Sequence, residues 1–99
     1  MRLSEAQVEA VRRVVRQVAG EEATATLFGS RLDDAARGGD VDLLVGVPYV
    51  VDNPALLIAR LSARLSAALG GRSVDVVLTA PNLARWAIHD VAQREGQRL

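Results

Sequence analysis

Apolar residues recur along this chain at two spacings, one typical of helices and the other of strands. In residues 4–19 the apolar stripe at helical spacing consists of Val8, Val11, Val15 and Val18. In residues 54–69 it consists of Leu57, Leu61, Leu65 and Leu69. Both segments are therefore predicted to be helices that bury one side and expose the other.

Polar residues mark the expected starts of these two helices. Ser4, three residues before Gln7, matches a capping box, in which each side chain bonds the other residue's backbone. Pro54 suits the first helical position because its missing N–H would have no partner there. Either Asp52 or Asn53 is then the expected cap of the second helix. Glycines follow both segments, as helix ends prefer.

Three short segments between turn residues have the alternation or apolar content of strands: residues 24–28, 41–47 and 73–78. A last helix is expected from Thr79 or Asn82 to about Arg94, with at most a stub of strand after Gly96. This order predicts an α/β (α+β) fold: a small mixed β-sheet of three to four strands with helices packed on one face. A single domain of residues 1–99 is expected.

Composition narrows the classes of function. The formal net charge is zero and only 3% of the residues are aromatic, so the sequence predicts no direct binding of nucleic acid. The chain has no cysteine, which excludes disulfides and thiolate metal sites and fits a cytoplasmic location. It shows no signal-like or membrane-spanning apolar run, so no membrane association is expected.

Aspartates stand in two of the strand segments, although strands disfavour this residue. Strand alternation places Asp40 and Asp42 on one face and Val41 on the other, and it places Asp75 opposite its own aliphatic neighbours. If residues 73–78 lie beside residues 41–47, the three carboxylates form a cluster suited to two Mg²⁺ ions. The simpler alternative is that Asp40 closes a loop and Asp75 faces water on an edge strand.

A Gly-Ser turn precedes these acids at the end of the first strand segment. Gly29 leaves the backbone open to close approach, and Ser30 offers a hydroxyl where a short helix is expected to begin. Arg31 adds a guanidinium that suits phosphate oxygens. We interpret these residues as a triphosphate site. As alternatives, Gly29-Ser30 is an ordinary turn and Arg31 a solvated or ion-paired arginine.

The run from Leu27 to Val45 resembles the nucleotidyltransferase signature of the DNA-polymerase-β superfamily, in which Gly-Ser precedes Asp-x-Asp by about ten residues. The short chain is similar to the minimal nucleotidyltransferase group, whose element order it matches. The resemblance implies the polymerase-β-like fold, triphosphate binding by Gly29 and Ser30, metal binding by Asp40 and Asp42, and a third catalytic carboxylate at Asp75. The spacer here has nine residues where ten is common in the group.

The predicted activity is Mg²⁺-dependent transfer of AMP from ATP to a hydroxyl, with Asp40, Asp42 and Asp75 as catalytic residues and ligands of two Mg²⁺ ions. Resemblance to the minimal group implies the antitoxin of a type VII toxin–antitoxin pair, whose acceptor is a HEPN-family RNase toxin. One alternative is a non-catalytic antitoxin that sequesters its partner by contact. A weaker one is transfer to a small molecule such as an aminoglycoside. The sequence leaves open whether the chain forms a homo- or hetero-oligomer.

Overall fold

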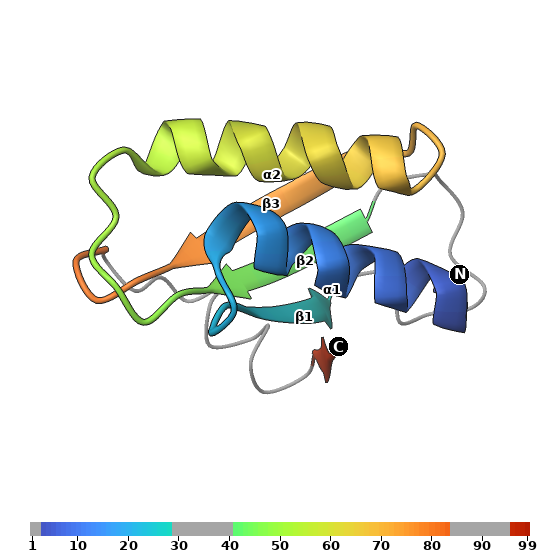
Figure 1. Cartoon of the computed structure of the whole chain (residues 1–99), viewed down its shortest axis with the longest axis horizontal. Coiled ribbons are helices and arrows are strands. Elements are labelled where there is room, and N and C mark those ends of the chain that lie inside the picture. The colour runs from blue at the N-terminus through green and yellow to red at the C-terminus, as the bar shows by residue number, and fades with distance from the viewer. Residues whose placement is uncertain (1–2, 29–40, 84–95) are drawn as a thin grey trace.

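The computed structural model describes residues 3–28, 41–83 and 96–99 (Figure 1). Its elements in chain order are α1 (Glu5–Ala19), β1 (Thr24–Phe28), β2 (Val41–Gly46), α2 (Pro54–Ala68), β3 (Val74–Thr79) and β4 (Gln97–Arg98). The three strand segments and two long helices predicted from the sequence are confirmed, and β4 is the expected terminal stub. The short helical turn expected after Ser30 and the last helix expected up to Arg94 lie outside the described residues.

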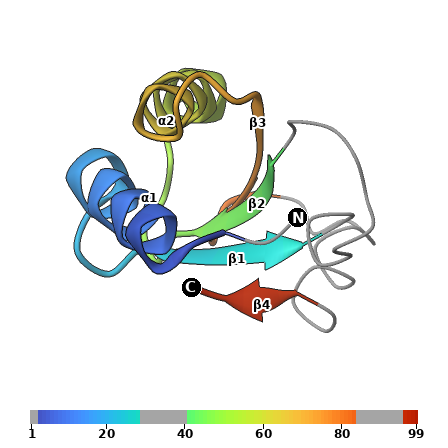
Figure 2. The same cartoon turned by 90° about the vertical axis from the view of Figure 1, so that its right-hand side faces the viewer.

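The four strands form one mixed sheet in the order β3-β2-β1-β4. β1 pairs antiparallel with both β2 and β4, whereas β2 and β3 are parallel. The parallel pair is joined through α2, the crossover that parallel neighbours require. α1 and α2 lie side by side on one face of this sheet (Figure 2). The predicted arrangement of a small mixed sheet with helices on one face is thus confirmed.

The main core lies between the helices and the sheet. Every second residue of β2 points into it, and Val41, Leu43 and Val45 have no exposed surface. α2 contributes Leu61 and Leu65, which are also fully buried, as its predicted leucine stripe requires. Because each strand places alternate side chains on opposite faces, the intervening residues of β2 lie on the face that the two helices do not cover.

α1 begins at the predicted capping box. The Gln7 amide nitrogen donates to Ser4 Oγ at 3.1 Å, and the Ser4 amide nitrogen donates to Gln7 Oε1 at 2.8 Å. The predicted stripe was right for Val11 and Val15, but Val14 and Ala19 are buried too, whereas Val8 and Val18 are only half-buried. α1 contacts both α2 and β1, so its buried side is wider than the narrow stripe assumed from the valine spacing.

Two asparagines stabilise the chain where it leaves β2 and β3. Asn53 is the cap of α2, because its Oδ1 accepts a hydrogen bond from the Leu56 amide at 3.1 Å. Asn82, a candidate cap for the expected last helix, forms two side-chain hydrogen bonds with the backbone of Val51. Its Oδ1 accepts from Val51 N at 3.0 Å, and its Nδ2 donates to Val51 O at 2.9 Å. No helix among the described residues is long and apolar enough to cross a membrane.

Candidate functional site

Asp42 and Asp75 lie directly opposite each other on neighbouring strands. β2 and β3 are parallel, and their register pairs these two residues. Neighbouring strands are about 4.8 Å apart, so the two carboxylates start from adjacent backbone positions. The condition stated from the sequence, that residues 73–78 lie beside residues 41–47, is met.

Both aspartates belong to the face of the sheet that α1 and α2 leave uncovered, which we call the open face. Their strand neighbours Val41 and Val74 are buried against the helices, and alternation directs Asp42 and Asp75 to the opposite side. Asp75 is exposed and Asp42 is half-buried. The two acids are therefore close together on a surface that a ligand can approach.

The chemistry of this pair suits a hard divalent cation. Like charges directly opposite each other on neighbouring strands repel, and carboxylate oxygens are the ligands that Mg²⁺ prefers. Mg²⁺ commonly binds one or two carboxylates and completes its shell with water and substrate phosphates, so two acids on an exposed face fit it. Within residues 3–28, 41–83 and 96–99, no three histidine, cysteine, aspartate or glutamate side chains gather as possible metal ligands.

The other predicted site residues, Gly29, Ser30, Arg31 and Asp40, lie outside the described residues. The described chain on either side shows where their segment is attached. β1 ends at Phe28, which is the register partner of Asp42, and β2 begins at Val41. Both ends of segment 29–40 are thus joined to the sheet at the end where Asp42 and Asp75 lie.

A small apolar cluster begins beside Asp42 and extends along the open face. Phe28 and Leu44 are buried there, and Val77 packs against them. Register places Leu44 beside Val77, one alternation beyond the Asp42–Asp75 pair. Leu44 and Val77 thus separate the acidic end of the open face from its opposite end, whereas Phe28 lies level with Asp42.

The opposite end of the open face contains a polar pocket that the sequence analysis missed. Its centre is Gly46, whose register partners are Thr24 on β1 and Thr79 on β3. Thr26 and Arg98 also line it, and they are register partners on β1 and β4. The alternation of β2 could have indicated this pocket, because Asp42, Leu44 and Gly46 stand at every second position and therefore share one face.

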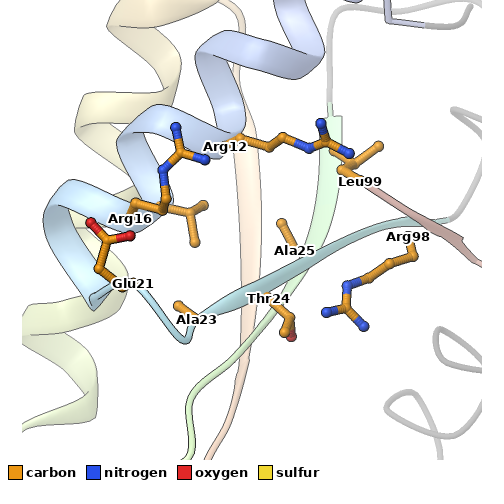
Figure 3. A pocket seen from close by; sticks show the side chains of 9 residues that line it. Arg12, Arg16, Glu21, Ala23, Thr24, Ala25, Arg98 and Leu99 are labelled. Carbon is orange, nitrogen blue, oxygen red and sulfur yellow. The ribbon is translucent and has the colours of Figure 1, made fainter.

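A second pocket lies at the border between α1 and the sheet, next to the start of β1 (Figure 3). Arg12, Arg16 and Arg98 all line it, but their guanidinium groups do not converge on one point in Figure 3. Arg98 extends to the same side of β1 as Thr24, away from Arg12 and Arg16. We therefore assign Arg98 to the polar pocket of the open face.

Comparisons of the chain with protein-family models, with curated proteins and with solved structures found no match. The resemblance to minimal nucleotidyltransferases thus stays a prediction from the sequence. What the structure adds is the register of Asp42 with Asp75 and the face on which both lie.

Proposed function

We propose that this protein is a Mg²⁺-dependent nucleotidyltransferase of polymerase-β-like fold, which transfers AMP from ATP to a hydroxyl of a partner protein in the cytoplasm. The partner proposed from the resemblance is a HEPN-family RNase toxin, with this chain as its antitoxin. The observation that supports the activity best is the Asp42–Asp75 pair in register on the open face, at the end where segment 29–40 joins the sheet.

In this proposal Asp40, Asp42 and Asp75 hold two Mg²⁺ ions, and the Gly29-Ser30 turn with Arg31 binds the triphosphate. Bound Mg²⁺ supplies Lewis-acid polarisation of the phosphoryl oxygens and neutralises charge that develops on the leaving group. The position of Phe28 opposite Asp42 supports this division, because Phe28 is followed directly in the sequence by the Gly-Ser dipeptide.

The reaction exchanges one P–O bond for another. The acceptor oxygen forms a bond to the α-phosphorus, the bond from that phosphorus to the bridging oxygen breaks, and pyrophosphate leaves with the bonding electrons. Asp75 orients the acceptor hydroxyl and accepts its proton. Asp75 suits this role because it is the more exposed of the two described acids and lies on the outer of the two parallel strands.

The test uses ATP labelled at the α-phosphate, Mg²⁺ and lysate of the source cell. We expect labelled protein with the wild-type chain and a loss of at least about a hundredfold with the Asp42→Asn/Asp75→Asn variant, since removal of a group that stabilises transition-state charge costs about that much. Asp52→Asn is the matched control, because Asp52 is an exposed carboxylate on the connection after β2. Undiminished labelling by the double variant would refute the site.

A second candidate function is contact-based sequestration of a partner without catalysis. Tyr49, Val50 and Leu56 favour it, because these apolar side chains are 43%, 62% and 52% exposed around the connection between β2 and α2. Nucleotide binding separates the candidates. ATP with Mg²⁺ at a hundred times its dissociation constant stabilises a binding protein by about 2.7 kcal/mol. No stabilisation by any nucleoside triphosphate with Mg²⁺ would favour sequestration.

A further inference from the structure

The polar pocket around Gly46 has the form of a binding site. It encloses about 260 Å³ on the open face, the same face that presents Asp42 and Asp75. A Cβ atom added at Gly46 would lie 2.9 Å from Thr24 Oγ1 and 3.2 Å from Thr79 Cγ2. The side chains of Thr24 and Thr79 therefore pack closely against Gly46, and any larger residue at this position would force at least one of them to move.

The groups around this space match an anionic ligand. Thr24, Thr26 and Thr79 bring hydroxyls, which can donate hydrogen bonds, and Arg98 brings a guanidinium. No acidic side chain is among the described residues that line the pocket. Figure 3 shows the Arg98 side chain on the same side of β1 as that of Thr24. Guanidinium and hydroxyl donors together recognise carboxylate or phosphate oxygens.

The pocket lies at a defined distance from the acids. Gly46 follows Asp42 by four residues on one strand and shares its face, which corresponds to roughly 13 Å along β2. Segment 29–40, with the proposed triphosphate site, joins the sheet beyond Asp42 in the other direction. Asp42 and Asp75 thus lie between the point where the described strands lead into segment 29–40 and the Gly46 pocket.

In-line displacement then decides which substrate the pocket serves. The attacking oxygen and the leaving oxygen lie on opposite sides of the phosphorus. If pyrophosphate leaves toward the Gly29-Ser30 end, the acceptor approaches from the end of the open face where Gly46 lies. We propose that the Gly46 pocket anchors the acceptor by an oxyanion, a carboxylate or a phosphate group, held by Arg98 and the threonine hydroxyls. This inference rests on the proposed function.

The first experiment measures oxyanion binding directly. The ¹⁵N-labelled full chain is titrated with inorganic phosphate and, separately, with N-acetyl-glutamate amide, and the signals of Thr24, Gly46, Thr79 and the Arg98 side chain are followed. We expect saturable shifts, with the tighter probe identifying the kind of oxyanion. Arg98→Gln should weaken binding roughly tenfold or more, because a hydrogen bond from a charged group is lost. Gly46→Ala should weaken binding as well, because the added Cβ would lie 2.9 Å from Thr24 Oγ1 and would displace that hydroxyl. Arg13→Gln, at an exposed arginine of α1 away from the pocket, is the matched control.

The second experiment separates the acceptor pocket from the nucleotide site. Gly46→Ala and Arg98→Gln should reduce labelling of the lysate acceptor by roughly tenfold while stabilisation by ATP and Mg²⁺ stays at the wild-type value. Three results would each overturn the inference. The first is that the probes cause no saturable shifts, and the second is that the pocket variants bind the probes as well as Arg13→Gln does. The third is that the pocket variants label the acceptor as well as the wild-type chain does. A parallel loss of nucleotide stabilisation would assign the pocket to ATP and overturn it as well. Nucleotide stabilisation absent from the wild-type chain would instead refute the proposed function itself.

Discussion

The two faces of the sheet are built from the same strands and have opposite character. The face under α1 and α2 presents valine, leucine and alanine, all packed into one core. The open face presents Asp42 and Asp75 at one end, a small apolar cluster in the middle, and threonines around Gly46 at the other end. Each strand thus contributes alternate residues to stability on one side and to candidate chemistry on the other.

The difference shows how a short chain combines a core with a candidate site. Acids placed side by side on the covered face would lose their hydration, which is costly for charged groups. On the open face they keep access to water and to a ligand. Substitutions on the two faces should therefore affect different measurements, namely the free energy of unfolding and the binding of nucleotide.

The largest effect is expected from Leu43→Ala compared with Leu44→Ala, two neighbours on β2 that point to opposite faces. Both side chains are buried, with 0% and 3% exposed surface. Leu43→Ala should lower the free energy of unfolding by about 2–5 kcal/mol, because it leaves a cavity in the main core. Leu44→Ala should cost less, because Leu44 packs in the small cluster and lines the open pocket. Denaturant unfolding measures both, and an equal or reversed order would contradict the contrast between the faces.

A smaller effect is expected at the helix that covers the core. Ser4→Ala removes the hydroxyl that caps α1 and should lower the free energy of unfolding by about 1 kcal/mol. Stabilisation by ATP with Mg²⁺ should stay unchanged, because Ser4 caps α1, which lies on the face of the sheet opposite the proposed nucleotide site. Ser62→Ala, inside α2, is the control and should not destabilise, because alanine is the better helix former. A changed response to nucleotide in Ser4→Ala would argue against separate roles for the two faces.

The smallest expected effect is an increase in the free energy of unfolding. Asp75→Asn removes one of two like charges that lie opposite each other, so it should raise the free energy of unfolding without metal by a few tenths of a kcal/mol. The same variant should weaken stabilisation by ATP with Mg²⁺, because a proposed ligand is lost. Asp52→Asn should change neither quantity. Thermal unfolding with and without Mg²⁺ measures both, and destabilisation of the metal-free variant would show that Asp75 serves the fold.

Local features of this fold were predictable because they depend on residues close in the chain. The capping box of Ser4 and Gln7 forms within one helical turn. The cap of α2 was narrowed to Asp52 or Asn53, and the structure selects Asn53. The side of β2 to which Asp42 points follows from alternation alone. Val14 was missed because the width of a buried helix side depends on how many elements pack against it, which valine spacing does not reveal.

The candidate site was predictable only in part. The acids were found from their unusual position in strand segments, and the alignment of Asp42 with Asp75 was stated as a condition. The Gly46 pocket was not foreseen, because no single segment contains its pattern. Thr24, Gly46 and Thr79 come from three strands and become neighbours only when β1 and β3 pair with β2. Gly29, Ser30, Arg31 and Asp40 stay sequence predictions.

The sequence by itself determined the strands and the two long helices of the described chain, the cap of α1, and the side of the sheet to which Asp42 and Asp75 belong. Only the tertiary structure decided that Asp42 faces Asp75, that Gly46 lies between two threonines, and that both groups share one open face. The physical reason is that alternation and capping are set by neighbouring residues, whereas register is set by backbone hydrogen bonds between segments far apart in the chain.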